Sequence, residues 1–134
     1  MNEKKYHKKI IANDLEGLAM VSACMSGGKV KVSDIKFLPS SRIFLLSVER
    51  SKNENEDNKK KVNSICRVDF CSKVKSKNID QKNQDLVLEL ITIDYLKNKE
   101  NFEINLIFKD NAHIALGIEV IDVTLEDQTE INKL

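Results

Sequence analysis

The chain has 134 residues, of which 41% are hydrophobic and 32% are charged, and 22 basic and 21 acidic residues give a formal net charge of +1. This length is typical of one domain and allows a core without disulfides or metals. The near-zero net charge predicts neither a nucleic-acid nor a membrane partner. Apolar runs such as residues 43–46 are far shorter than the roughly 20 residues of a membrane-spanning helix.

The first predicted element is an amphipathic helix over residues 14–26, which follows a basic arm over residues 1–9. Asn13, with Glu16 three residues later, has the spacing of a capping box and is the predicted N-cap. Gly27-Gly28 predicts the end of the helix, because glycine accepts the left-handed conformation found there. Apolar and small residues recur at helical spacing at Leu15, Leu18, Ala19, Ser22 and Met25.

After the helix, apolar residues recur with a period of two, which is typical of β-strands. The pattern slips by one residue near 33–34 and again near 120–121, which predicts a bulge or a short break at each place. Asp110-Asn111 predicts a two-residue hairpin turn, since both residues tolerate positive φ. The predicted strands cover residues 30–37, 43–50, 64–71, 85–95, 102–109 and 114–125.

These elements predict a single α+β domain over residues 1–134. A second helical pattern is absent, which excludes parallel crossovers, so we expect an antiparallel meander of about six or seven strands, folded as a sandwich or partly open barrel. Residues 51–61 contain no apolar side chain, which predicts a flexible polar loop over 51–62, and the tail over 127–134 is expected to fray. The predicted core contains Leu88, Leu90, Leu106, Phe108 and Leu116, with Leu18 of the helix docked on it.

The cysteines predict a reduced protein. Cys24, Cys66 and Cys71 form no C-x-x-C pair, and on a regular strand Cys66 and Cys71 face opposite sides. We interpret them as small hydrophobic residues and not as redox, nucleophilic or zinc-binding thiols. With no recognisable signal peptide, the chain is expected in the cytoplasm.

Catalytic chemistry finds little support in the sequence. His7 and His113 have no sequence neighbour that would orient a general base, and Glu89 and Asp94 are predicted on opposite faces of one strand. The sequence therefore predicts no catalytic, cofactor-binding or metal-binding residues and favours a protein that is not an enzyme.

Charge is unevenly distributed along the chain. Residues 59–82 carry a net charge of +6, whereas residues 85–134 carry −7. Lys73, Lys75 and Lys77 recur at every second position and would share one face of an extended segment, with Arg67 nearby. These four residues are the predicted interaction surface, and a nucleic-acid backbone could follow them. We expect instead that acidic groups such as Glu89, Glu103 and Glu119 lie opposite the lysines and neutralise them.

An ordered set of residues runs through most of the chain: Asp14-Leu15-Glu16, Leu18, Ser22, Ala23, Val32, Asp34, Phe37-Leu38-Pro39, Arg42, Phe44, residues 76–80, Leu86-Val87-Leu88, Ile91, Ile93, Ile104, Leu106, Phe108, Ile114, Leu116, Val120-Ile121 and Leu125. This set resembles the uncharacterised, mainly alphaproteobacterial family known as domain of unknown function 2948. The resemblance spans roughly residues 9–127, and the family typically carries aromatic residues after Arg50, where residues 51–57 are polar here. The resemblance implies a bacterial lineage and no mechanism.

The sequence favours a non-catalytic binding or protein-interaction module, with a protein partner or a homodimer formed through an edge strand. Weak nucleic-acid binding by the basic 59–82 region is one alternative, although the sequence disfavours it because aromatic residues are not interleaved with the basic ones. The other alternative is an enzyme that acts on a small molecule and has no recognisable motif. A basic surface, an exposed apolar patch or a polar pocket would discriminate among these three.

Overall fold

The computed structural model describes residues 8–51 and 61–128 and shows one helix with ten antiparallel strands, which confirms the predicted α+β class. A short 3-10 turn, Val32–Asp34, lies where the strand pattern slips. The elements are β1 (Lys9–Ala12), α1 (Leu15–Met25), β2 (Lys29–Lys31), β3 (Ile35–Leu38), β4 (Ile43–Ser51), β5 (Lys61–Val68), β6 (Cys71–Lys77), β7 (Val87–Asn98), β8 (Asn101–Phe108), β9 (His113–Ile118) and β10 (Val123–Asp127).

The helix begins one residue later than the predicted cap. Asp14, in an extended conformation, is the N-cap, and its Oδ1 accepts a hydrogen bond of 2.7 Å from the N–H of Gly17. The prediction that Asn13 caps the helix is therefore wrong, although both residue types cap well. Gly27, with a φ of +85°, ends the helix as predicted.

The strands run in the order β1-β10-β5-β4-β2-β7-β8-β9-β6, and β3 pairs with β4. Consecutive strands pair in the β4-β5 hairpin and the β7-β8-β9 meander, whereas β1-β10, β10-β5, β2-β7 and β9-β6 join strands that are distant in sequence. The sheet does not close into a barrel, because β1 and β6 remain at its two ends. Most of β6 lies beyond residue 71, in a polar segment where the sequence predicted no strand.

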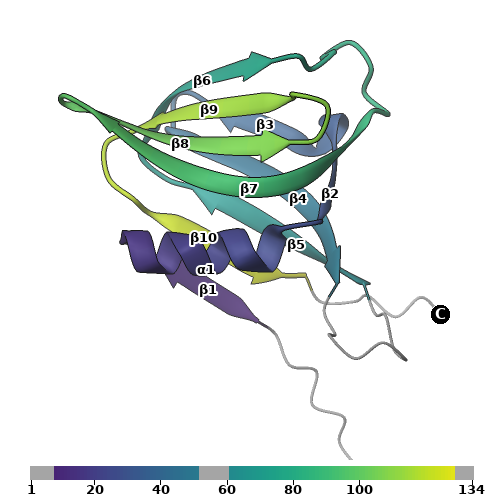
Figure 1. The fold of residues 1–134 in the computed structure, drawn as a ribbon, viewed down its shortest axis with the longest axis horizontal. Helices are drawn as coiled ribbons and strands as arrows, with labels where there is room; N and C mark the ends of the chain where they lie inside the picture. Colours follow the sequence, from purple (N-terminus) through teal and green to yellow (C-terminus); the bar gives the residue numbers. More distant parts are fainter. Residues whose placement is uncertain (1–7, 52–60, 129–134) are drawn as a thin grey trace, which may run out of the picture.

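Two layers result, and Figure 1 shows them one behind the other. The front layer holds β6, β9, β8 and β7, and α1 continues it beyond β7. The layer behind holds β3, β4, β5, β10 and β1. The core fills the space between them, and all six predicted core residues are buried there. Among the described residues, no helix is long and apolar enough to cross a membrane.

Strand β7 contains a bulge at Ile91, where its register with β8 shifts between Leu90 and Thr92. Leu90 and Ile93 are both buried, whereas Ile91 is 47% exposed. The extra residue resets the alternation, so Glu89 and Asp94 both lie on the outer side of β7. The prediction that they face opposite sides is therefore wrong.

A corner at Phe70 carries the chain from β5 in the rear layer to β6 in the front layer. Phe70 has a φ of +55°, which is rare for a bulky residue, and the N–H of Cys71 donates to the carbonyl oxygen of Arg42. The corner also resets the alternation, so Cys66 and Cys71 are both buried. The prediction that these two cysteines face opposite sides is wrong for this reason.

A buried polar cluster joins the ends of β4, β5 and β10. Arg50 donates to Asp127 Oδ1 at 2.7 Å and to Ser64 Oγ at 3.0 Å, and the hydroxyl of Ser64 donates to the same aspartate oxygen at 2.7 Å. Asp127, the first residue of the predicted tail, is thus the last residue of β10 and only 2% exposed. At the two ends of the predicted 51–62 loop, Ser51 of β4 pairs with Lys61 of β5. The rest of the loop, residues 52–60, lies outside the described part of the chain.

Candidate interaction surface

The predicted lysines lie on β6, a terminal strand of the sheet, and among the described strands β6 pairs only with β9. Lys73, Lys75 and Lys77 are exposed, and they pair with Gly117, Ala115 and His113 of β9, respectively. The lysines share the outer face of β6, because the side chains of every second residue point to the same side of a strand. The structure therefore brings three of the four predicted residues together.

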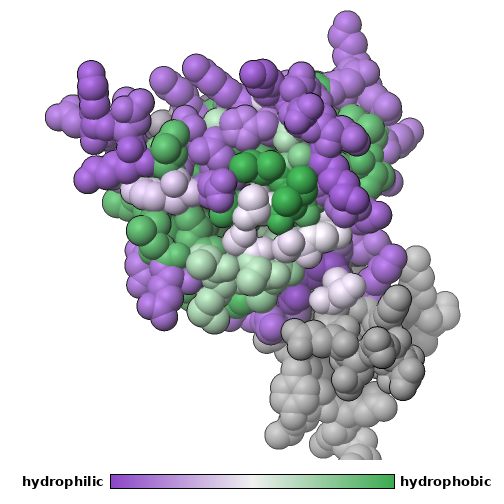
Figure 2. All heavy atoms as spheres, viewed as in Figure 1, coloured by the Kyte–Doolittle hydropathy of each residue, from purple (hydrophilic) through white to green (hydrophobic). Residues whose placement is uncertain are grey.

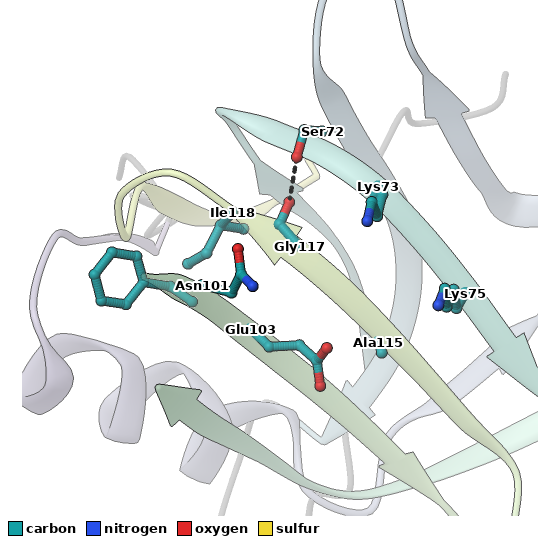
Figure 3. Close-up of a pocket in the computed structure, with 9 residues that line it drawn as sticks. Ser72, Lys73, Lys75, Asn101, Glu103, Ala115, Gly117 and Ile118 are labelled. Atoms are coloured by element: carbon teal, nitrogen blue, oxygen red, sulfur yellow. Dashed lines mark hydrogen bonds between the residues drawn. The ribbon is translucent and has the colours of Figure 1, made fainter. Parts of the chain in front are cut away.

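Beside Lys73 and Lys75 the outer face of the front layer is hollowed, with a cavity volume of about 170 Å³ (Figure 3). Gly117 and Ala115 form the middle of this hollow, and their small side chains leave the space open. A Cβ atom at Gly117 would lie 3.2 Å from Cβ of Lys73, so even alanine would crowd the lysine there. The full lining is Ser72, Lys73, Lys75, Asn101, Phe102, Glu103, Ala115, Gly117 and Ile118.

The hollow has charges of both signs. Lys73 and Lys75 stand on β6, while Glu103 projects from β8 on the other side of Ala115 and Gly117 (Figure 3). Glu103 is the one predicted neutralising acid that lies in the same hollow as the lysines. This arrangement suits a group that presents an anion to the lysines and a hydrogen-bond donor to Glu103.

Arg67 does not belong to this surface. It lies on β5 in the rear layer, and its guanidinium donates two hydrogen bonds, of 3.0 and 2.9 Å, to the carboxylate of Asp69. The hydrogen bond and charge of Asp69 raise the pKa of Arg67. The sequence placed Arg67 near the lysines on the assumption of a continuous strand, and the Phe70 corner turns it away.

The other two predicted neutralising acids pair elsewhere. Glu89 lies 3.1 Å from Nζ of Lys109 and 3.5 Å from Nζ of Lys29, and the hydrogen bond from Lys109 lowers the pKa of this carboxyl. Glu119 forms an ion pair with Arg42. The expectation that these two acids neutralise the β6 lysines is therefore wrong.

His113 has an orienting partner that sequence reasoning missed. Its Nε2 lies 2.6 Å from Oδ1 of Asn105, and Asn105 is only 8% exposed although it lies on the outer face of β8. The two residues meet diagonally across the β8-β9 ladder. The sequence spacing of eight residues around the 110–111 turn was the available signal, since it places them on the same face of a hairpin.

A second hollow, of about 310 Å³, lies at the end of α1. It brings together Lys8, Cys24, Ser26 and the buried Arg50. Arg50 is already bonded to Asp127 and Ser64, so its charge is largely satisfied within the protein.

Thiol and metal chemistry find no further support in the described part of the chain. Burial raises the pKa of the Cys66 thiol to about 12 and also raises that of Cys71, which keeps both protonated and unreactive at neutral pH. Across residues 8–51 and 61–128, no three His, Cys, Asp or Glu side chains are grouped so that they could hold a metal ion.

Comparison with known protein families identifies the family of this chain. A family model with the description "Protein of unknown function (DUF2948)" matches residues 8–133, which is nearly the whole chain. No curated protein and no solved structure matches significantly. The match confirms the family that the sequence resembles, and its description names no activity or ligand.

Proposed function

The chain belongs to the DUF2948 family, and we propose that it is a non-catalytic interaction module that binds an extended acidic segment of another protein. The observation that carries this proposal is the placement of Lys73, Lys75 and Lys77 in one line on a terminal strand, beside a hollow. A terminal strand can accept an added strand, and its backbone then supplies affinity while its side chains select the partner.

The geometry predicts the chemistry of the bound segment. A strand added beside β6 would present every second side chain to the same face as the lysines. Acidic residues at alternate positions would therefore meet Lys73, Lys75 and Lys77. Opposite charges on directly neighbouring strands stabilise their pairing, and like charges destabilise it.

A nucleic-acid partner fits the same surface less well. A phosphate backbone favours a continuous basic surface, whereas Glu103 lies within the hollow and Arg67 is bonded to Asp69 on another layer.

Lysines on an exposed strand also serve to prevent edge-to-edge aggregation, which is the simplest alternative. That protective role requires no selective binding of acidic peptides, so a binding experiment separates the two readings.

The test is fluorescence anisotropy with a labelled peptide that alternates glutamate and valine, compared with a lysine–valine peptide of the same length. We expect saturable binding of the acidic peptide alone, and its loss in a variant carrying Lys73→Glu, Lys75→Glu and Lys77→Glu. The matched control changes the exposed Lys9, Lys31 and Lys82 to glutamate, which shifts the net charge equally and should preserve binding.

Two further probes fix the mode of binding. An acidic peptide with N-methyl groups on the edge that faces β6 cannot donate to the strand, and we expect it to bind at least tenfold more weakly. Single-stranded RNA and a DNA duplex should not bind at low salt. Salt-sensitive binding of either nucleic acid that the triple β6 variant abolishes would replace the proposal with the nucleic-acid alternative, and failure of the acidic peptide to bind would end it.

A further inference from the structure

The outward side of α1 is apolar, which is unusual for a helix at the surface. Leu15 is 56% exposed and Met20 is 55% exposed, and Ala19 and Ala23 are exposed between and beyond them. The inward side, Leu18, Val21 and Met25, is buried in the core. A surface helix normally carries polar residues opposite its buried stripe, and a helix that is apolar all round is normally covered on both sides.

Strand β7 continues this apolar surface beside the helix. The bulge turns Ile91 outward, and the hydroxyl of Ser26 donates to the carbonyl oxygen of Ile91 at 2.9 Å, which fixes the helix end against the strand. The Ser22 and Thr92 hydroxyls lie 3.2 Å apart across the seam. Figure 2 shows apolar residues gathered over α1 and β7 on this face. Contiguous exposed apolar surface of this kind marks an interaction site.

Charge indicates which partner covers the surface. Glu16 is the acidic residue of α1, and it lies on the exposed side in the first turn. Lys8 lies at the other end of the helix, where it shares a hollow with Ala23, Cys24 and Ser26. The surface therefore carries an acid at one end, a base at the other and apolar residues between them. A two-fold rotation places the acidic end of one copy opposite the basic end of the other copy. The surface is therefore complementary to a second copy of itself.

We propose that two copies of this chain associate through this surface, with α1 packed antiparallel against the partner's α1 about an axis near Ala19 and Met20. Glu16 of each protomer faces the partner's Lys8, and the two helix dipoles oppose each other favourably. Ala19 and Ala23 allow the helices to approach closely. The chain's net charge of +1 adds little repulsion between the copies.

The association is measured by sedimentation velocity of the full chain over a range of concentrations, under reducing conditions. We expect a dimer of twice the chain mass that Met20→Glu shifts to monomer. Val120→Glu is the matched control, since Val120 is 51% exposed in the bend between β9 and β10, outside α1 and β7, and it should leave the dimer intact. A wild-type chain that stays monomeric up to about 100 μM, a weak limit for specific association, overturns the proposal.

A charge exchange tests the antiparallel arrangement itself. Glu16→Lys brings like charges together across the axis and should weaken the dimer about fivefold, and adding Lys8→Glu should restore it. Circular dichroism melts of each variant show that it folds. A dimer that Glu16→Lys leaves unchanged, or that Lys8→Glu fails to rescue, contradicts the antiparallel pairing. Loss of dimerisation with intact acidic-peptide binding leaves the proposed function standing, since β6 lies apart from α1.

Discussion

Arg50 and Arg67 each pair with an aspartate, but their surroundings differ. Arg50 and Asp127 are 5% and 3% exposed in their side chains and share the hydroxyl of Ser64, whereas Arg67 is 49% exposed beside Asp69. Removing one partner of a buried ion pair leaves the other charge in a place where water solvates it poorly. Removing one partner of an exposed ion pair leaves a charge that water solvates instead.

We therefore expect Arg50→Ala to lower the free energy of unfolding by about 3 kcal/mol, measured by urea denaturation. Arg67→Ala is the matched control and should cost less than about 1 kcal/mol. Equal costs for the two variants would show that the buried cluster stabilises no more than a surface pair.

The Cys66 thiol predicts a pH dependence of stability. Burial raises its pKa from 9.0 to about 12, so above pH 9 the unfolded chain loses this proton while the folded protein keeps it. Stability is therefore unaffected below pH 9 and falls as the pH rises towards 12.

Cys66→Val removes this titration while it keeps a similar volume, so the wild type should lose about 1 kcal/mol more than the variant between pH 8 and pH 10. Chemical denaturation under reducing conditions at both pH values measures the difference. Parallel losses in the two proteins would show that this thiol does not titrate differently on folding.

At the scale of elements, the start of α1 provides a sharp test. The N–H of Gly17 bonds to the side chain of Asp14, so Asp14→Ala should cost about 1 kcal/mol of stability. Asn13→Ala, one residue earlier, should cost less than about 0.5 kcal/mol. Thermal unfolding followed by circular dichroism compares the two variants, and a larger cost at residue 13 would restore the cap that the sequence predicted.

Local chemistry made some elements predictable. Asp110 and Asn111 have φ values of 63° and 61°, as the predicted hairpin turn requires, and Gly27 ends the helix because its own backbone permits it. The Ile91 bulge and the Phe70 corner depend instead on contacts with Ser26 and with residues of distant strands. A pattern of alternation cannot indicate such contacts, so the faces of residues beyond each irregularity were predicted wrongly.

The candidate interaction surface was also predictable only in part. The spacing of Lys73, Lys75 and Lys77 predicted that they share a face, because strand geometry alone fixes it. The hollow depends on β6 lying beside Gly117 and Ala115, and β6 and β9 are separated by two other strands in the sequence. Pairing between strands that are distant in sequence leaves little local signal, so the hollow could not be predicted.

At the scale of the whole molecule, β10 ties the sheet together. It lies between β1 and β5, and Asp127 at its end completes the buried cluster with Arg50. Deleting residues 123–134 removes this strand and should abolish the cooperative thermal transition. Deleting only residues 129–134 keeps the hydrogen bond from Gln128 to Asn63 and should lower the melting temperature by less than about 4 °C. A cooperative transition in the longer deletion would show that β10 is dispensable.

The position of β10 also bears on how the protein is made. β1 is synthesised before the other described strands, yet Lys9 pairs with Glu126, which is added to the chain more than one hundred residues later. At roughly 5–20 residues per second, the first strand waits about 6–23 s for its partner. Until β10 has been synthesised, β1 and the edge of β5 lack the strand that lies between them in the folded protein. This part of the sheet therefore forms last, and it depends on contacts between residues that are far apart in the sequence.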